Sequence, residues 1–519
     1  MGTSWVLSQE AALGRVSWRV PPSGRLTALD LGFSVALRPL QRQRGRAAGR
    51  STTEPSPRSR EAMGFLGLLS TAAAWVCLAL TLFVPPLLIV LVLGLLLPRR
   101  APPQRSGGKC SKVAFVHPDL GIGGAERLVV DAAVALQKAG HEVNIFTARH
   151  ETNHCFEETR NGTLRVHVHG NFLPRRVLGR FYAACAYLRM CWVSVVIVLL
   201  SFRIPFHVII VDQVSICLPI LRLARPRAIL FYCHYPDYLL TAKSSVLKSL
   251  YRAPLDFLEE VTTGLADQIF VNSRFTAGVF AAAFPLLSWF GVCPDVLYPP
   301  LDLQGQDEAA RKAADALDVL GEGEQLLLSI NRFERKKNVG LAIRTLARLP
   351  EETRRLTRLV LAGGYDDRLP ENVEHAAELE DLATQLGVAD RVVQKRSVSL
   401  VEKATLLRHA ACLLYTPDRE HFGIVPVEAM YARVPVVAVN TGGPLESIVD
   451  GETGFLRPQE PEAWAEPVEK LLKDPALRKR FGEAGRQRAS SCFSLEAFGK
   501  ALDAAVRRNE DGSIADKDR

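Results

Sequence analysis

The sequence predicts an α/β protein with two Rossmann-like domains behind an N-terminal membrane segment. A strand, a glycine turn and a helix follow one another from residue 112, which is how a Rossmann-like unit opens. A second series of short apolar strands begins near residue 325. The uncharged stretch from Gly64 to Leu97 is longer than the roughly 20 residues that cross a bilayer once. A chain of 519 residues has room for all three parts.

Composition and charge exclude several classes of protein. A hydrophobic content of 48% with 23% charged residues fits globular domains that carry a membrane segment. The net charge is +9, but residues 1–62 hold ten Arg, no Lys and four acidic residues, or +6, which leaves +3 for the rest. This balance does not indicate a nucleic-acid partner. The ten cysteines are scattered without a CxxC pair, which argues against a zinc site and for a reducing compartment.

The chain opens with an Arg-rich arm, residues 1–62, which we expect to be disordered; a transit-like segment is the alternative. Met63 begins a stretch that could itself be the start of the working protein. The membrane segment, residues 63–98, is divided by Pro85 and Pro86. It is either a single span or a helical hairpin. The basic residues after it predict that the following domains are cytosolic.

The first domain is expected over residues 110–300 and opens with a strand, Val113 to Val116. Gly121, Gly123 and Gly124 form the turn into a helix. Bare amides at a helix N-terminus can face a phosphate. A lone glycine-rich loop is a weak signal, but this one follows a strand and precedes a helix, as a phosphate loop requires.

Further strands are expected at residues 141–147, 207–212, 228–233 and 268–272. His234 comes directly after the third of these, at the edge of an open sheet where ligands bind. A histidine after a strand is more often structural, and both interpretations stay open. Residues 190–202 are apolar and uncharged, which is typical of a buried helix or of a helix in the membrane interface.

The second domain is expected over residues 324–490, with strands at residues 326–330, 358–362, 392–394, 411–415 and 434–439. Arg332 and Lys337 belong to a cluster of cations between the first strand and the helix 339–349. Cations at a helix N-terminus oppose the helix dipole. An anion such as a diphosphate between them would remove the conflict. The alternative is a solvated basic loop. Gly364 and the pair Gly442-Gly443 follow later strands as close-approach turns.

Two carboxylates, Glu420 and Glu428, flank the segment that leads from the fourth of these strands into a helix. Gly423 between them lets backbone approach a ligand closely. A carboxylate in such a loop can accept paired hydrogen bonds from the vicinal hydroxyls of a sugar. The alternative is a capped helix with two solvated glutamates.

These two segments together resemble the retaining glycosyltransferases of family 4, which have the GT-B fold. That family carries an Arg with a Lys five residues later, matched by Arg332 and Lys337, and a spaced Glu pair, matched by Glu420 and Glu428. The stretches HPDLGIGGAERLV, LFYCHYPD, NRFERKKN and EHFGIVPVEAM resemble more closely the α-1,3/1,6-mannosyltransferases of the dolichol pathway. The resemblance runs from about Ser111 to about Val506.

The resemblance implies two Rossmann-like domains that face across a cleft, and a role for each candidate residue. The catalytic residues would be His234, Glu420, Arg332 and Lys337. The donor-binding residues would be Arg332, Lys337, Glu420, Gly423, Glu428, Gly364, Gly442 and Gly443. The acceptor and phosphate loop would comprise Gly121, Gly123, Gly124 and Glu260. A C-terminal helix, residues 491–508, would pack back on the first domain, with a disordered tail at residues 509–519.

The implied reaction is the retaining transfer of mannose from GDP-mannose to dolichyl-diphosphate-linked Man1GlcNAc2, first α-1,3 and then α-1,6. Arg332 and Lys337 would stabilise the charge on the leaving GDP, so no metal or cofactor is expected. The enzyme would work on the cytosolic face of the endoplasmic reticulum membrane, with other dolichol-pathway transferases as further partners. The alternatives are a UDP-sugar-dependent glycolipid glycosyltransferase of the same fold and a non-catalytic membrane scaffold.

Overall fold

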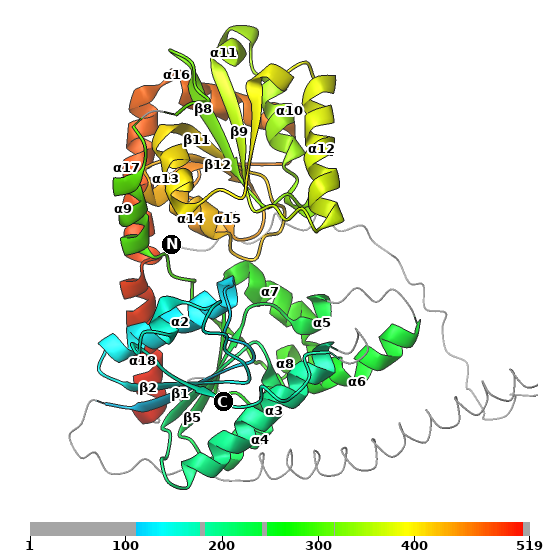
Figure 1. Cartoon of the computed structure of the whole chain (residues 1–519), viewed down its shortest axis with the longest axis vertical. Coiled ribbons are helices and arrows are strands. Elements are labelled where there is room, and N and C mark those ends of the chain that lie inside the picture. The colour runs from blue at the N-terminus through cyan, green and yellow to red at the C-terminus, as the bar shows by residue number, and fades with distance from the viewer. Residues whose placement is uncertain (1–109, 177–181, 241–245, 316, 512–519) are drawn as a thin grey trace, which may run out of the picture. The chain divides into compact units, whose positions relative to one another are not determined.

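The computed structural model of the chain describes residues 110–176, 182–240, 246–315 and 317–511 (Figure 1). The predicted arm, residues 1–62, and the predicted membrane segment, residues 63–98, lie outside the described residues. Both sheets described below belong to one compact unit, Cys77–Arg519.

The first domain is built on a seven-stranded parallel sheet in the order β3-β2-β1-β4-β5-β6-β7. The central strands are buried on both faces, which is why they appear in the sequence as continuous apolar runs. The strands are β1 Lys112–His117, β2 Glu142–Thr147, β3 Arg165–Val168, β4 Val208–Asp212, β5 Ala228–Cys233, β6 Gln268–Val271 and β7 Asp295–Val296.

Helices cover both faces of this sheet, each over its own apolar core. One core joins the sheet to α3 and α4, and the other joins it to α2 and α18. The helices of the domain are α2 Gly124–Lys138, η1 Glu157–Thr159, α3 Tyr182–Ser201, η2 Ser215–Cys217, α4 Leu218–Leu223, α5 Asp237–Leu240, α6 Val246–Thr263, α7 Arg274–Ala283 and α8 Pro285–Trp289.

The second domain has a six-stranded parallel sheet in the order β10-β9-β8-β11-β12-β13. Its strands are β8 Gln325–Ile330, β9 Thr357–Gly363, β10 Val392–Arg396, β11 Ala410–Tyr415, β12 Val436–Val439 and β13 Gly454–Arg457. Its helices are α9 Leu303–Lys312, η3 Arg335–Lys337, α10 Gly340–Arg348, α11 Glu351–Arg355, α12 Pro370–Gln385, η4 Ala389–Arg391, α13 Leu400–His409, α14 Ile424–Tyr431, α15 Pro444–Ser447, α16 Pro461–Lys473 and α17 Pro475–Cys492. The α/β fold with two Rossmann-like domains is thus confirmed.

The last helix, α18 Leu495–Asp511, continues from α17 and lies against α2 of the first domain (Figure 1). His141 Nε2 and Asp503 Oδ1 are 2.7 Å apart at this contact. Asn509 is buried and donates to Gln268 Oε1 over 2.7 Å. This bond holds the last turn in place, so the helix extends to Asp511 and the predicted start of the disordered tail at Asn509 is corrected.

Helix α3 combines the two alternatives that its sequence left open. By length and composition alone it is the one helix among the described residues that could cross a membrane, and 33% of its most apolar window is buried. Met190, Val193 and Ile197 pack into the core of the first domain. Trp192 and Leu199 are exposed on another side of the helix. The helix therefore belongs to the core and also presents an apolar surface.

Candidate active site

Three side chains meet at the carboxyl ends of neighbouring parallel strands in the first domain. His117 ends β1, Asp212 ends β4 and His234 follows β5. Asp212 lies between the two histidines, with His117 Nδ1 2.9 Å from its Oδ2 and His234 Nε2 2.9 Å from its Oδ1. Glu126 Oε1 is 3.9 Å from His117 Nε2 on the other side. The arrangement fixes the ring of His234 through a carboxylate that sequence reasoning missed.

Burial and hydrogen bonding act in opposite directions on this group. Burial disfavours protonated His117, but its contacts with Asp212 and Glu126 outweigh burial and raise the pKa of His117 to about 9. Burial also opposes ionised Asp212, and the two histidines overcome it and lower the pKa of Asp212 to about 2. Near neutral pH the structure therefore holds an ionised Asp212 beside a protonated His117.

The glycine turn is the N-terminus of α2. Gly123 is the N-cap residue and no side chain caps the helix there. A methyl group on Gly121 or Gly124 would meet nothing within 4 Å, whereas one on Gly123 would lie 2.2 Å from the Glu126 carboxylate. The uncapped end of a 15-residue helix leaves backbone amides available to an anion, as a phosphate loop requires.

Helix α6 supports the loop that carries His234 through the carboxylate of Glu259. Glu259 accepts hydrogen bonds from the backbone amides of Asp237 at 2.6 Å and Tyr238 at 3.1 Å. Burial is the main reason that the pKa of Glu259 rises to about 7. Asn272 Nδ2 donates to the carbonyl of His234 over 3.1 Å. Glu259 and Glu260 are adjacent in α6, and Glu259 positions the loop of His234.

Glu260, the other member of that pair, does not face a cleft. Its Oε1 accepts from the amide of Leu286 over 2.6 Å, and the residue is buried. It caps the short helix α8. This position corrects the prediction that Glu260 approaches the acceptor, because a buried helix cap has no surface to offer.

The predicted donor residues of the second domain come together in part. Lys337 Nζ is 2.5 Å from Glu420 Oε2, and both side chains are largely buried. Thr416 at the end of β11 donates to the carbonyl of Lys337 over 2.7 Å and places this lysine against the strand end. The Arg332 side chain is 62% exposed and lies 2.9 Å from Glu334. Arg335 of the same cationic cluster is bound by carboxylates of α12.

Glu428 lies in the second turn of α14 and is buried. Lys403 Nζ and Gln306 Nε2 both contact its Oε1, at 2.7 and 3.3 Å. Lys403 was not predicted as a site residue, because nothing in its own surroundings in the sequence distinguishes it.

The predicted glycines shape the loops around Glu420. A methyl group on Gly442, which has φ +66°, would lie 2.5 Å from the Glu420 carbonyl oxygen. On Gly443 it would lie 2.0 Å from that of Phe422. Gly423, with φ +78°, similarly lies against Tyr415. A methyl group on Gly364 would meet only the Arg332 side chain. On its neighbour Gly363 a methyl group would clash with the backbone of Asn331.

The two domains touch at the loops that carry these residues. The rings of Tyr235, next to His234, and His421, next to Glu420, stack at 3.9 Å with an interplanar angle of 12°. Ser273 donates to the carbonyl of His421. None of these contacts could be found from local sequence, because their members are more than a hundred residues apart.

A carboxylate of the second domain also caps a helix of the first. Glu446 accepts hydrogen bonds from the amides of Arg274 at 2.8 Å and Phe275 at 3.0 Å, at the N-terminus of α7. Tyr298 Oη lies 3.0 Å from the same carboxylate. Glu446 therefore joins the halves of the molecule beside the candidate site.

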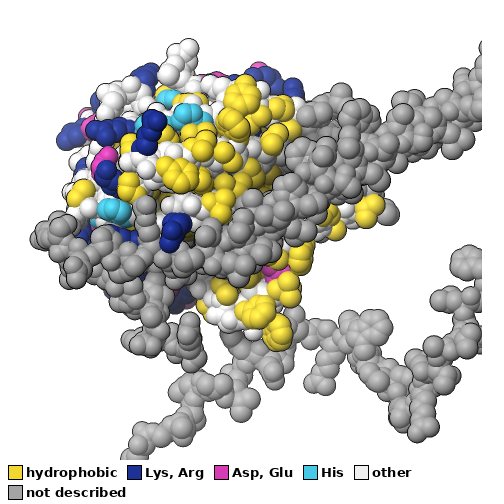
Figure 2. Space-filling view, turned by 90° about the horizontal axis from the view of Figure 1, so that it is seen from below, with side chains coloured by type: hydrophobic (Ala, Val, Ile, Leu, Met, Phe, Trp, Pro, Cys, Tyr) yellow, Lys and Arg dark blue, Asp and Glu magenta, His cyan; other side chains and the backbone are white. Residues whose placement is uncertain are grey.

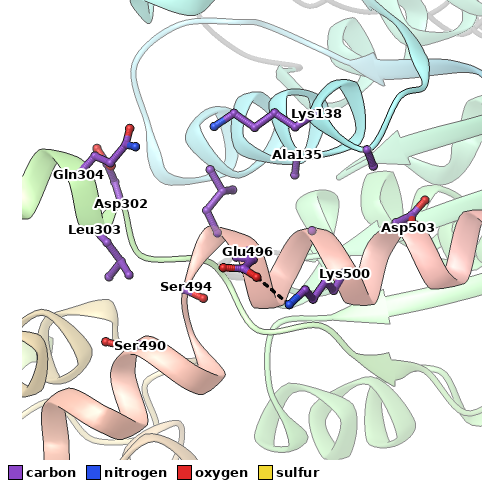
Figure 3. A pocket seen from close by; sticks show the side chains of 13 residues that line it. Ala135, Lys138, Asp302, Leu303, Gln304, Ser490, Ser494, Glu496, Lys500 and Asp503 are labelled. Carbon is purple, nitrogen blue, oxygen red and sulfur yellow. Dashed lines mark ion pairs between the residues drawn. The ribbon is translucent and has the colours of Figure 1, made fainter.

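A separate cavity of about 630 Å³ lies where the chain crosses between the domains (Figure 3). Its lining comes from α2, from the start of α9 and from the junction of α17 and α18, and it contains none of the predicted site residues. Among the described residues no group of three or more His, Cys, Asp or Glu is arranged to hold a metal. Metal independence stays a prediction.

The family model described as "Glycosyltransferase Family 4" matches residues 122–288, and that described as "Glycosyl transferases group 1" matches residues 314–488. The α-1,3/1,6-mannosyltransferase ALG2 of Mus musculus is 50% identical over 398 residues, covering 75% of this chain and 94% of the relative. That of Rhizomucor pusillus is 48% identical over 421 residues, covering 77% and 92%. This chain belongs to the ALG2 family of α-1,3/1,6-mannosyltransferases.

The solved structures agree on the fold of this ALG2-family chain. Sucrose-phosphate synthase from Thermosynechococcus elongatus gives a TM-score of 0.58 at 20% identity, covering 77% of this chain and 99% of that structure. HepE of Anabaena in complex with UDP gives 0.57 at 19% identity, covering 76% and 99%. At this identity the likeness shows the fold alone. The fold is GT-B, as predicted, and the chain is a glycosyltransferase.

Proposed function

We propose that this ALG2-family chain transfers mannose from GDP-mannose to dolichyl-diphosphate-linked Man1GlcNAc2, adding an α-1,3 and then an α-1,6 mannose during assembly of the N-glycan precursor. The single observation that carries the proposal is the stacking of His421 on Tyr235. This contact brings the loop of the Lys337–Glu420 pair against the loop of His234, in a chain whose relatives are named α-1,3/1,6-mannosyltransferases.

The chemical demand is to break the anomeric C–O bond while negative charge develops on the leaving GDP. Lys337 and the exposed Arg332 are the cations for this charge, together with the open amides at the N-terminus of α2. Before the donor binds, Lys337 is held by Glu420 at 2.5 Å. When the diphosphate attracts Lys337, Glu420 is released to accept hydrogen bonds from the mannose hydroxyls.

His234 is the group of the first domain that faces the reacting sugar in this proposal. Asp212 holds its ring, so that the imidazole keeps one orientation as the sugar changes shape. Glu428 binds the ribose of the nucleotide. Lys403 and Gln306 both contact Oε1 of Glu428, and among the described residues Oε2 has no contact of this kind and is left for the ribose hydroxyls.

The membrane is the remaining partner. Figure 2 views the molecule from the side on which α3 and α4 lie in Figure 1, and hydrophobic side chains gather on the face it shows. Exposed large hydrophobic side chains of α3, of α6 and of the end of α8 include Leu188, Trp192, Leu199, Phe257, Trp289 and Phe290. An exposed apolar surface of this kind is typical of a membrane contact. We place the enzyme on the cytosolic face of the endoplasmic reticulum membrane.

The test uses membranes that contain the full chain, GDP-mannose with EDTA, and a phytanyl-diphosphate acceptor bearing one mannose on chitobiose. Two successive hexose additions, seen in the product masses, are the expected result. A single addition would limit the enzyme to one linkage. No addition with GDP-mannose, but activity with a UDP-sugar, would show that the donor is a UDP-sugar and would favour the glycolipid transferase alternative. No activity with any donor would favour the scaffold.

A further inference from the structure

Arg189, in the middle of α3, is a buried arginine that forms no ion pair with any residue that the structure describes. The residue is 7% exposed. Its Nε and Nη1 atoms are buried and have no hydrogen-bond partner within the described part of the chain. Leaving a guanidinium buried and unpaired destabilises a fold, because the desolvated charge gains nothing in return. Such a group is expected where a ligand supplies the missing acceptor.

Asp119 and two further arginines, Arg175 and Arg149, stand close enough to act on the charge of Arg189. Arg175 Nη2 lies 2.7 Å from Asp119 Oδ2, and Arg149 is paired with Glu151. Three cations therefore share two carboxylates. Asp119 acts on Arg189 but forms its ion pair with Arg175, so the buried arginine is the one without an ion pair among the described residues.

The arginine cluster, Arg149, Arg175 and Arg189, contacts the turn between β1 and α2, which is the predicted phosphate loop. The amide of Leu120 donates to the carbonyl of Arg149 over 2.9 Å. Asp119, which holds Arg175, precedes Gly121 by two residues in the turn between β1 and α2. The cations of the donor proposal, Arg332 and Lys337, belong to the other domain. The arginine cluster is thus a separate positive site on the acceptor side of the molecule.

Apolar side chains lie next to these arginines. Phe172, three residues before Arg175, is 72% exposed. Its ring meets that of Trp192 edge to face at 5.5 Å. Trp192 follows Arg189 by three residues on α3 and is 41% exposed. A ligand in this place would meet cations on one side and an aromatic, apolar surface on the other.

We propose that Arg189, with Arg175 and Arg149, binds the diphosphate of the lipid-linked acceptor, while the first part of its lipid lies over Phe172 and Trp192. The inference rests on the proposed function for the identity of the acceptor. A diphosphate suits the site because its several oxygens can accept from the planar forks of more than one guanidinium. The lipid suits the apolar pair beside it.

The substitution that tests the proposal is Arg189→Met in the full chain, which keeps most of the side-chain volume and removes the charge. Without ligand we expect an unchanged or higher Tm, because an unpaired buried charge is lost. With the phytanyl-diphosphate acceptor we expect the KM for the acceptor to rise about 10- to 100-fold, since hydrogen bonds to charged groups are lost. The KM for GDP-mannose should not change. Arg203→Met is the control and should leave both constants as they are, because Arg203 is an exposed arginine just after α3.

A second acceptor isolates the diphosphate. The same oligosaccharide on a neutral alkyl anchor should be used poorly by the wild-type enzyme, and Arg189→Met should make no further difference. A fall in Tm without ligand, with the KM values unchanged, would show a structural arginine and overturn the proposal. A rise in the KM for GDP-mannose instead would assign the cluster to the donor.

Binding without turnover separates this inference from the proposed function. Wild-type protein should bind phytanyl diphosphate more tightly than phytanol, and Arg189→Met should remove the difference, whatever sugar donor the enzyme uses. If inorganic diphosphate alone binds as well as the lipid, the apolar part of the proposal is wrong. If the variant loses only its binding to vesicles of anionic phospholipid, the ligand is a membrane headgroup and the acceptor assignment fails.

Discussion

Lys337 and Lys336 are adjacent lysines in very different surroundings. Lys337 is largely buried against Glu420, whereas the Lys336 side chain is 67% exposed and pairs with Glu334. We expect Lys337→Ala to lower kcat about 100- to 1000-fold, because in the proposed reaction the preorganised charge of Lys337 stabilises the leaving diphosphate. Lys336→Ala should change kcat by less than about threefold. Initial rates of mannose transfer distinguish the two, and equal losses would contradict the assignment.

The pair His117–Asp212 predicts how stability depends on pH. The pKa of His117 rises from 6.5 to about 9 in the folded chain. Its contribution is therefore fully present below pH 6.5 and is lost as the pH rises through about 9. It amounts to about 3 kcal/mol at most. Asp212, with its pKa lowered to about 2, stays ionised throughout this window.

The free energy of unfolding of the wild type should thus decline between pH 6.5 and pH 9.5, and His117→Asn should remove much of that decline. Chemical unfolding at the two pH values measures it. His154→Asn is the control, because His154 is exposed and lies outside the group formed by His117, Asp212, His234 and Glu126. A pH dependence that survives in His117→Asn would count against a protonated His117.

Local sequence made Arg332, Lys337 and Glu420 candidates but did not indicate their partners. The cationic cluster after one apolar strand and the glutamate after another left solvated loops as the alternative, and the resemblance to family 4 glycosyltransferases supplied the donor-binding roles, which stay predictions. The contact of Lys337 with Glu420 spans 83 residues of sequence, so only the sheet order that sets β8 beside β11 reveals it. Asp212 was not predicted as a site residue, because a single aspartate at the end of a strand has no distinguishing sequence pattern.

The strands also divide into those that local sequence predicts and those that it misses. Most buried strands, such as β8 and β11, were predicted within one residue of their ends, because continuous apolar runs with turns on both sides leave little choice. The buried strand β12 was predicted to begin two residues too early. Strands β3, β7 and β13 were missed. They lie at the sheet edges, and β3 is half polar and partly exposed while β7 has only two residues. An edge strand is held by its neighbour more than by its own sequence.

The turn between β12 and α15 fixes the position of the Glu420 loop through Gly442. Gly442→Ala would combine a left-handed backbone with a clash against the Glu420 backbone at 2.5 Å. Gly451 also has positive φ, but a methyl group there meets nothing within 4 Å. We expect Gly451→Ala to cost about 1 kcal/mol of stability and to leave kcat unchanged. Gly442→Ala should cost more and should lower kcat as well. Unfolding and rate measurements on both variants test this, and equal kinetics would contradict the coupling.

The two domains are joined by a small set of specific contacts beside the candidate site. The stacking of Tyr235 on His421 and the bond from Ser273 to the His421 carbonyl bring the loops together. Glu446 caps α7 from the opposite domain. Ser273 also caps α7 from within the first domain, through the amide of Thr276. The helix therefore does not depend on Glu446 to fold, and the glutamate is free to set how the domains meet.

Because Ser273 caps α7 within its own domain and Glu446 caps it from the other domain, the effect of Glu446→Ala can be predicted. The variant should lose about 1 kcal/mol of stability, which is the ordinary cost of removing a helix cap. It should also raise the KM for GDP-mannose several-fold, because the domains no longer hold the His421 and Tyr235 loops together. Asp474→Ala is the matched control, since Asp474 caps α17 through the amide of Leu477 within one domain. It should show a similar loss of stability with unchanged kinetics. If both variants have the same KM as the wild type, Glu446 is only a helix cap, and the orientation of the domains depends on the stacked rings and on α18.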